Sequence, residues 1–285
     1  MNISKIPTYI LALYTIILGL LSCNNSDHTI KIKGSDTEVN LAVNLAEQFD
    51  KINNNYRISV SGGGSGLGIT SLLNGTADIA NSSRPLTAEE QQMFKDKNIS
   101  LRTVVFAEDA TAFIVHKDNP IKEIDVQTLR EIMSGQISGW QKILALDLPI
   151  NIYGRQSSSG THSFIKKKLG IEYSPKAKEM TGNAQIIEGI KMDKSGIGYV
   201  GAGYISKNPA QNEGIKVLKI KEKSSSIAIS PLDQHAIKNK AYYFQRPLYQ
   251  FIPLSQWKKV QAFIEFETAG KGREIIENSG YYLVN

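Results

Sequence analysis

The stretch TIKIKGSDTEVNLAVNLAEQFDKI (residues 29–52) contains the pattern that decides the fold, which is a strand, a loop of small residues and a helix. Residues 29–33 alternate apolar and polar side chains, and this alternation predicts a half-buried strand. A glycine and three polar residues follow at 34–37, where either Ser35 or Asp36 is a suitable helix N-cap. The apolar face of the predicted helix is formed by Leu41, Leu45, Phe49 and Ile52.

The same order of strand, loop and helix recurs along the chain. Three further loops of small residues each follow a predicted strand: SGGGSGLG (61–68), NSSRPL (81–86) and GRQSSSGTHSF (154–164). The apolar run at 103–116 predicts two strands or one bent strand, because Glu108 and Asp109 interrupt it. Two helices, near 255–267 and 271–278, close the chain. This alternation is typical of an α/β fold with a mostly parallel sheet.

Composition limits the classes of protein that the chain can represent. It has 285 residues, a length that fits two lobes or one large domain, and 41% of them are hydrophobic, as in globular proteins. The net charge of +6 comes from scattered lysines without the basic block typical of nucleic-acid binding. The single cysteine excludes a disulfide framework, and the four dispersed histidines lack metal-ligand spacing, so we expect no metal and no cofactor.

The N-terminus has the features of a secretion signal. Lys5 precedes an apolar stretch from Tyr9 to Leu21 that is short for a membrane span, so residues 1–22 are predicted to be a signal peptide. The ending Leu-Leu-Ser-Cys resembles a bacterial lipobox, which implies cleavage before Cys23 and lipidation of its thiol. Residues 23–28 then form a short polar tether. The alternative is an uncleaved anchor, and either way the rest of the chain is exported.

Four loops rich in glycine and hydroxyl side chains precede predicted helices: GSDT (34–37), GGGSG (62–66), NSSR (81–84) and RQSSSGT (155–161). A helix N-terminus presents unpaired N–H groups, hydroxyls add donors, and glycine lets a ligand approach the backbone. Arg155 adds a planar fork of donors that suits a tetrahedral oxyanion. The four loops together therefore predict a site for a buried oxyanion.

Other oxyanion-binding motifs do not fit these loops. GGGSGLG lacks the glycine spacing of a dinucleotide-binding loop, and the chain contains no P-loop. A nucleophile elbow requires glycine two residues after its serine, but Leu67 occupies that position after Ser65. An exported serine hydrolase that uses Ser65 or Ser159 with His162 stays open as an alternative.

Motifs along nearly the whole mature chain resemble the phosphate-binding lipoproteins of bacterial phosphate ABC transporters. They are IKIKGSDT, VSGGGSGLGI, GTADIANSSRPL, FAEDATAFIVHKDNP, LREIMSGQISGW, RQSSSGTHSFI, SGIGYVGAGY, RPLY and AFIEFETAGKGREIIENSGYYLV. Each motif alone is modest, but the set in this order is highly specific.

The resemblance implies a two-lobed periplasmic-binding-protein-like fold of type II with the ligand in the cleft between the lobes. Lobe one would comprise residues 29–106 and about 247–285, and lobe two about 107–246. Two crossovers, expected near Phe106–Ala110 and Arg246–Phe251, would act as the hinge.

The resemblance also implies the ligand residues, and these lie in the four loops already identified: Ser35, Asp36, Thr37, Ser65, Gly66, Ser82, Ser83, Arg155, Ser159, Gly160 and Thr161. Arg84 and Ser157 are weaker candidates, because Arg84 alternatively pairs with Asp78 or a surface acid. Ser83 and Ser157 stand where known members carry acids, and the first of those acids accepts the phosphate proton. Asp36 either supplies that acceptor or caps the helix.

The implied function is the capture of inorganic phosphate, without catalysis, for delivery to the permease subunits of an ABC importer. The protein would be a monomer in the cell envelope, extracytoplasmic or periplasmic and lipid-anchored through Cys23. Sulfate or molybdate is the alternative ligand, and a non-transporting phosphate sensor or adhesin is the alternative role.

Overall fold

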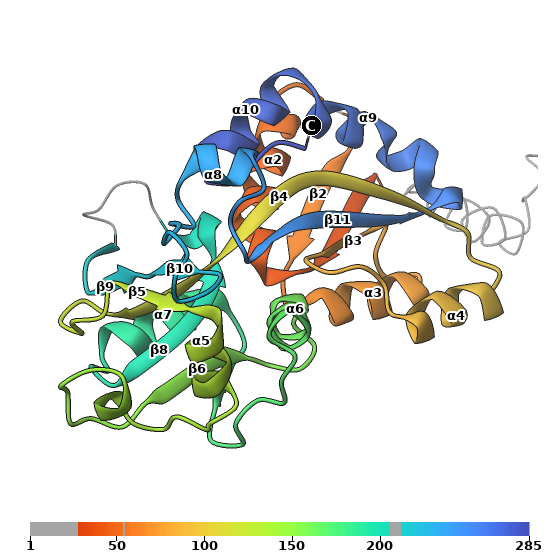
Figure 1. The fold of residues 1–285 in the computed structure, drawn as a ribbon. Coiled ribbons are helices and arrows are strands. Elements are labelled where there is room, and N and C mark those ends of the chain that lie inside the picture. Colours follow the sequence, from red (N-terminus) through yellow and green to blue (C-terminus); the bar gives the residue numbers. More distant parts are fainter. Residues whose placement is uncertain (1–27, 54, 206–211, 285) are drawn as a thin grey trace, which may run out of the picture.

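The computed structural model describes residues 28–53, 55–205 and 212–284, and it is drawn as a ribbon in Figure 1. The predicted signal peptide, Cys23 and all of the tether except His28 lie outside the described residues. Across the described part of the chain, every helix is too short or too polar to cross a membrane.

The first part of the structure is a sheet with helices on both faces (Figure 1). Its parallel strands are β2 (Arg57–Ser61), β1 (Thr29–Gly34) and β3 (Ile79–Ser82), in that order, and β11 (Gln245–Pro253) runs antiparallel to β3. One face carries α2 (Val39–Asp50), α9 (Trp257–Thr268) and α10 (Gly270–Asn278). The other face carries α3 (Ser65–Leu73) and α4 (Ala88–Asp96).

The second part surrounds the other half of the same sheet. Its strands are, in order, the distal end of β4 (Leu101–His116), β8 (Gly196–Gly201), β6 (Asn151–Arg155) and β7 (Lys178–Met180). Strand β9 (Ile215–Val217) pairs with β4 instead. Helices α5 (Val126–Met133), α6 (Gly160–Leu169), α7 (Asn183–Lys191) and α8 (Gln234–Lys238) surround them. A two-stranded sheet joins β5 (Glu123–Asp125) and β10 (Lys219–Lys221). Short 3₁₀ turns occur at Asp36–Glu38 (η1), Trp140–Lys142 (η2), Ala202–Tyr204 (η3) and Leu254–Gln256 (η5).

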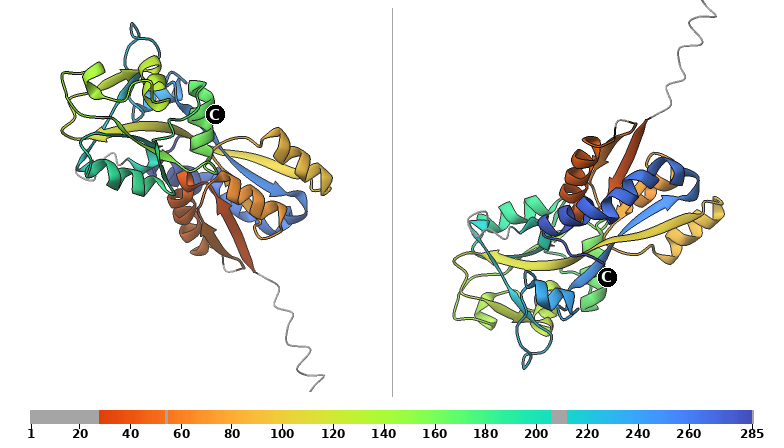
Figure 2. Two further views of the ribbon diagram at one scale, coloured as in Figure 1. Left: turned by 90° about the horizontal axis from the view of Figure 1, so that it is seen from below. Right: turned by 90° about the horizontal axis from the view of Figure 1, so that it is seen from above.

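Strands β4 and β11 run from one part into the other, as Figure 2 shows from two sides. They pair antiparallel from Leu101–Pro253 to Ala110–Gln245, with a register shift between Leu248 and Tyr249. Separate apolar cores lie on either side of this connection. One core contains Ile32, Leu45, Leu248 and Phe263, while the other is built around Phe113, Leu129, Trp140 and Phe244. The lobe boundaries stay a prediction, which this separation of cores supports.

Several expectations about individual elements were wrong. The sheet is mixed rather than mostly parallel, because β11 and β4 run antiparallel to their neighbours. Of the two alternatives predicted for the apolar run at 103–116, the structure has the single strand, over Leu101–His116. The first helix begins at Val39 after a 3₁₀ turn, and Ile52 lies beyond its end with 69% of its surface exposed. The short strand after Ala77 begins at Ile79. Helix α7, which the sequence patterns did not single out, forms part of the site.

Candidate anion-binding site

The first loop leaves β1 at Gly34, whose φ of 141° belongs to the region that favours glycine. A Cβ there would lie 2.1 Å from the carbonyl oxygen of Asn81, so the loop packs closely against the end of β3. The Ser35 N–H donates to that carbonyl at 2.9 Å. The Ser35 hydroxyl accepts from the Thr37 N–H at 3.3 Å, which makes Ser35 the N-cap of η1. Ser35 therefore caps this short turn, whereas the N-cap position of α2, the helix it was predicted to cap, is occupied by Glu38.

The second and third loops meet through two buried serines. The Ser83 N–H donates to the Ser65 hydroxyl at 3.1 Å, and the two hydroxyl oxygens lie 3.5 Å apart. Ser82 is turned into its own loop, because its hydroxyl donates to the Arg84 carbonyl at 2.6 Å. The Arg84 guanidinium binds both carboxylate oxygens of Glu90, each at 2.7 Å. It is paired within α4 and its preceding loop, and not with Asp78.

The fourth loop reaches the first three from the other part of the molecule. Ser159 is the N-cap of α6 and accepts from the backbone N–H of Thr161. A Cβ on Gly160 would lie 2.3 Å from the Ser65 hydroxyl and 2.6 Å from that of Ser83, so only glycine permits this approach. The Gly66 N–H donates to the carbonyl of Ser158, the residue before Ser159, at 3.0 Å. The N-termini of α3 and α6 therefore face each other across the cleft.

Arg246, on β11, contacts three of the four loops. Its Nη2 donates to the hydroxyls of Thr161 at 2.9 Å and Thr37 at 3.3 Å, and these two hydroxyls are 2.9 Å apart. Its Nη1 donates to the Ser83 carbonyl at 3.4 Å. Arg246 was predicted only as one end of a hinge crossover. The missed signal was a pair of opposite charges, Asp109 and Arg246, inside two segments that are rich in apolar and aromatic residues.

Asp109 and Arg246 form a buried ion pair at directly opposed positions of β4 and β11. The Asp109 Oδ2 accepts from Nη2 at 2.8 Å and from Nε at 3.1 Å, and the side chains are 0% and 2% exposed. Burial raises the pKa of the Asp109 carboxyl, and the attraction of Arg246 limits this rise. The pair fixes the orientation of the guanidinium beneath the loops.

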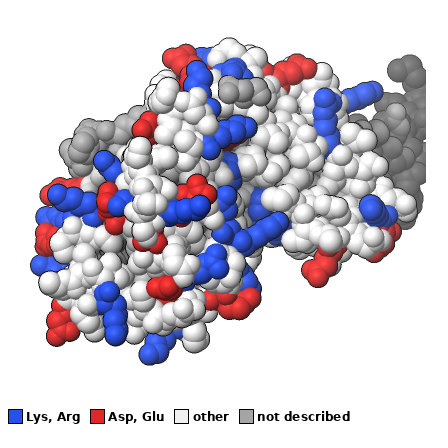
Figure 3. All heavy atoms as spheres, viewed as in Figure 1, with Lys and Arg blue, Asp and Glu red and all other residues white. Residues whose placement is uncertain are grey.

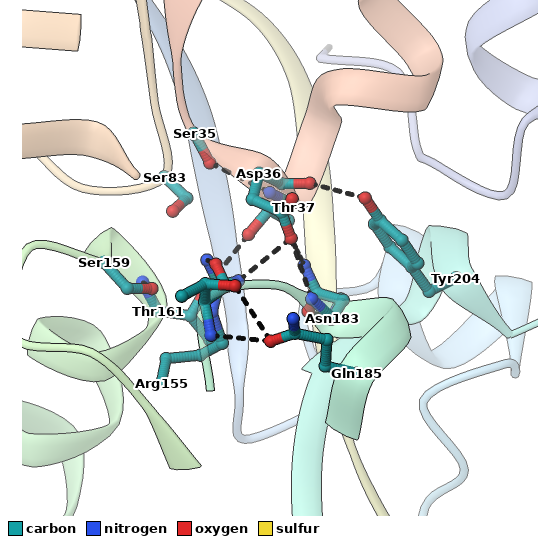
Figure 4. A network of polar contacts seen from close by, with 12 residues as sticks. Ser35, Asp36, Thr37, Ser83, Arg155, Ser159, Thr161, Asn183, Gln185 and Tyr204 are labelled. Atoms are coloured by element: carbon teal, nitrogen blue, oxygen red, sulfur yellow. Dashed lines mark hydrogen bonds and ion pairs between the residues drawn. The ribbon is translucent and has the colours of Figure 1, made fainter. Parts of the chain in front are cut away.

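Arg155 forms a second pair, with Asp36 of the opposite lobe (Figure 4). Its Nη1 donates to Asp36 Oδ2 at 3.2 Å and its Nη2 to the Thr181 carbonyl at 2.8 Å. The same Asp36 oxygen accepts from the Asn183 backbone N–H at 2.8 Å and from Asn183 Nδ2 at 2.6 Å. Asp36 thus caps the start of α7 rather than its own helix. The Nε of Arg155 is buried and makes no hydrogen bond within the described structure.

The structure brings most of the predicted residues together in one buried polar cluster. Its members from the prediction are Thr37, Ser65, Gly66, Ser83, Arg155, Ser159, Gly160 and Thr161, with Ser35 and Asp36 at its edge. Ser82 and Arg84 bond within their own loop, and Ser157 is exposed to solvent. The role of each residue as an anion ligand stays a prediction.

His162 does not lie as a catalytic base would. Its ring stacks on Tyr173 with 4.5 Å between ring centroids, and burial lowers its pKa. No hydrogen bond between its ring and a serine hydroxyl occurs in the described residues, where its backbone N–H instead donates to Ser159 Oγ. The same part of the chain holds no group of three or more histidine, cysteine or acidic residues able to bind a metal.

A groove of about 540 Å³ adjoins the cluster, with Ser83 and Arg246 in its wall. Its other walls come from the loop before α4, from β11 and from α6, which contributes Phe164, Lys167 and Lys168. Figure 3 shows lysine and arginine side chains gathered over α6, on the face where the two lobes meet. The site is therefore bordered by positive charge, which attracts anions from solution.

Two lobes, two connecting strands and a buried polar cluster between the lobes define a two-lobed solute-binding protein whose cleft suits a small oxyanion. The chain belongs to the PBP superfamily, whose family model matches residues 24–270. The predicted family and fold class are thereby confirmed.

Relatives of similar length cover almost the whole chain. It is 30% identical over 280 residues to the phosphate-binding protein PstS of Staphylococcus aureus, covering 94% of this chain and 84% of that protein. It is 29% identical over 273 residues to the phosphate-binding protein PstS of Borreliella burgdorferi, covering 92% and 93%.

Solved structures share the fold. One is a putative phosphate ABC transporter substrate-binding protein with bound phosphate from Clostridium perfringens, with a TM-score of 0.79 and 23% identity, covering 90% of this chain and 100% of that one. Another is an ABC-type phosphate transport receptor from Vibrio cholerae, with a TM-score of 0.68 and 26% identity over the same shares.

Proposed function

We propose that the protein is an extracytoplasmic solute-binding protein that captures inorganic phosphate for an ABC importer. One observation carries the proposal: loops from both lobes converge on a single buried cluster of hydroxyls, helix N-termini and two guanidinium groups. Two relatives that align with this chain over most of their length are named phosphate-binding proteins, which supports phosphate as the ligand.

The chemistry of the cluster suits a tetrahedral oxyanion. Hydroxyls of Ser65, Ser83 and Thr161 supply donors, and the N-termini of α3 and α6 supply N–H groups and the positive ends of two helix dipoles. Donors that are fixed before binding need little reorganisation, and burial strengthens their attraction for a charged ligand. Binding requires no covalent step, so the proposed activity is binding and not catalysis.

Closure of the cleft follows from the division of the donors between the lobes. Thr37, Ser65 and Ser83 belong to one lobe, whereas Arg155 and Thr161 belong to the other. An anion between them gains its full set of contacts only when the lobes are together. Phosphate therefore favours the closed form through its higher affinity for that form, and we propose that the permease subunits recognise the closed surface.

Titration calorimetry with phosphate, sulfate and molybdate tests the assignment. We expect one phosphate per chain and weaker binding of sulfate and molybdate. Ser83→Ala should weaken phosphate binding by about 1.5–3 kcal/mol, the value of a hydrogen bond to a charged group. Ser157→Ala is the matched control, because this serine of the fourth loop is exposed and should leave the affinity unchanged. A preference for sulfate or molybdate would overturn the phosphate assignment while leaving the class of protein intact.

His162→Ala separates binding from hydrolysis. A binding protein keeps its phosphate affinity in this variant, because the imidazole packs on Tyr173 away from the serine hydroxyls. Turnover of a phosphate or carboxylate ester that disappears in the variant would favour the hydrolase instead.

The cellular role is part of the same proposal. We infer export through residues 1–22, a lipid anchor at Cys23 and action as a monomer beside the membrane. Metabolic labelling with a radioactive fatty acid should mark the wild-type chain and leave Cys23→Ala unlabelled. Equal labelling of the two chains would contradict the anchor.

A further inference from the structure

Glu38, the last residue of η1, is a buried acid with no partner for its charge-bearing atoms. The residue is 0% exposed, and within the described structure neither carboxylate oxygen accepts or donates a hydrogen bond. Leaving a buried polar group unpaired costs free energy, so native structures rarely do so without a functional reason. The carboxyl lies in the same turn as Asp36 and Thr37, next to the predicted anion site.

A comparison within the chain explains why this carboxyl is left over. Thr87 and Glu90 have the serine/threonine-x-x-glutamate spacing of a capping box, and the Thr87 N–H donates to Glu90 Oε2 at 2.8 Å. Ser35 and Glu38 have the same spacing. Their box is incomplete, because the Ser35 N–H donates to Asn81 at the end of β3 instead. The Glu38 carboxylate therefore does not accept the hydrogen bond that would complete the capping box.

The turn places Glu38 beside the hydroxyl of Ser35. Ser35 is the N-cap of η1 and Glu38 is the last residue of η1, and the Ser35 hydroxyl is near enough to act on the Glu38 carboxyl. The Ser35 hydroxyl lowers the pKa of Glu38, although no hydrogen bond of normal geometry joins the two groups. Thr37, between them in sequence, contacts Thr161 across the cleft.

Burial favours the neutral form of Glu38, and the charged groups on the elements packed against it act in both directions. The titratable groups that face it are Asp36 on η1, Asp109 on β4, Arg246 on β11, Tyr204 on η3 and Tyr281 after α10. Burial raises the pKa of Glu38 well above its usual value, Asp109 and Asp36 raise it further, and Arg246 with Ser35 opposes the rise.

We propose that Glu38, acting through the Ser35 hydroxyl, determines which protonation state of an oxyanion the site accepts. The proposal rests on the proposed function and deepens it. Ser35 has one O–H to donate and two lone pairs, one of which already accepts from the Thr37 N–H. Because the hydroxyl has a single proton, it donates either to Glu38 or to the ligand.

The protonation of Glu38 decides between these two arrangements. When Glu38 is ionised, the Ser35 O–H turns to the carboxylate and offers the ligand only a lone pair, which suits an anion with its own P–OH donor. When Glu38 is neutral, its O–H donates to Ser35, and the Ser35 proton turns to the ligand, which suits an anion with no proton. Glu38 is thus a positioning residue, and its ionisation excludes sulfate while retaining hydrogen phosphate.

The test is the affinity for phosphate and for sulfate measured across pH 5–9 by titration calorimetry. With one linked proton, sulfate binding to the wild type should weaken by up to about tenfold per pH unit once Glu38 ionises. Glu38→Gln should remove this slope, because the amide cannot ionise. The titration of phosphate itself affects both proteins equally, so it cancels in the ratio of the wild-type affinity to the variant affinity at each pH.

Glu267→Gln is the matched control, because Glu267 is also 0% exposed in the same lobe but lies between α9 and β11. It should leave the sulfate slope unchanged. If Glu38→Gln does not fold, the wild type still tests the proposal: sulfate binding in two buffers of different ionisation enthalpy must show uptake of a proton at alkaline pH. Phosphate binding with equal sulfate slopes in wild type and Glu38→Gln, or with no proton uptake on sulfate binding, would overturn this proposal alone. Failure of both ions to bind at every pH would overturn the proposed function and this proposal with it.

Discussion

The two buried arginine–aspartate pairs of this molecule differ in what they join. Arg246 and Asp109 lie opposite each other on the two connecting strands, with side chains 2% and 0% exposed. Arg155 and Asp36 come from different lobes, and the Asp36 side chain keeps 18% of its surface exposed. Because the first pair joins two strands that are hydrogen-bonded to each other, we expect it to stay together whether the cleft is open or closed, and we expect the second to form only when the cleft closes. The first is therefore expected to govern stability, and the second to govern ligand-linked closure.

The largest expected effect comes from breaking the pair on the connecting strands. Arg246→Ala leaves the Asp109 charge buried without a partner, which should lower the free energy of unfolding by about 3–5 kcal/mol. Urea denaturation measures this loss. Lys166→Ala is the control, because it breaks a surface pair with Glu172 and should cost about 0–1 kcal/mol. Equal losses in the two variants would show that the buried pair does not determine stability.

Removal of the cross-lobe arginine should act on binding instead. Arg155→Ala should weaken phosphate binding by about 2–5 kcal/mol, the range for truncating one partner of a buried charge pair. The loss of stability should stay below that of Arg246→Ala, since Asp36 keeps Asn183 as a partner and some contact with water. Calorimetry provides the affinity. A change of less than a tenth of the expected value would contradict a role for Arg155 in binding.

Glu267 is a buried acid that has no arginine as a partner among the described residues. Glu267 accepts only from Gln250 at 3.1 Å, and burial raises its pKa from 4.5 to about 8. Its folded-state pKa exceeds the unfolded value, so stability is full below about pH 4.5 and falls as the pH rises through 8. We expect a loss of about 2–4 kcal/mol between pH 5 and 9.

Glu267→Gln should make stability flatter over this pH range, because the amide keeps a neutral hydrogen-bonding group beside Gln250. Urea midpoints at several pH values compare the two proteins. Parallel curves for wild type and variant would contradict an ionisation of Glu267 within this range.

The smallest expected effect comes from Asp36, the other member of the cross-lobe pair. Asp36→Asn keeps the shape of the side chain but removes the charge that holds Arg155 and caps α7. We expect phosphate binding to weaken by about 1–2 kcal/mol, near the cost of a lost cap. Sulfate binding should weaken by the same factor if Asp36 acts only through Arg155 and Asn183 of the opposite lobe. A narrowed phosphate-to-sulfate ratio would instead make Asp36 a direct contact of the ligand.

The loops of the site could be predicted from the sequence because their residue types indicate their roles. Glycines and hydroxyls before apolar helices mark close backbone approach and capping, and Gly160 fits between Ser65 and Ser83 for this reason. The capping box at Thr87 and Glu90 could likewise be predicted, since both partners lie within one turn. Local chemistry of this kind does not depend on the rest of the fold.

The pairs could not be predicted because their partners are distant in sequence. Asp36 is separated from Asn183 by 147 positions, and Arg246 from Asp109 by 137. Asp36 was therefore interpreted as a cap of the nearest helix, although it caps α7 in the other lobe. The sheet was predicted to be mostly parallel, because nothing local shows that β11 returns antiparallel between β3 and β4.

A crystal structure of the mature chain grown with phosphate tests the central claim most directly. The account predicts one tetrahedral ion between the lobes, within hydrogen-bond distance of Ser83 from one lobe and Thr161 from the other. An ion held by one lobe alone, or loops that lie apart with their hydroxyls in solvent, would contradict it.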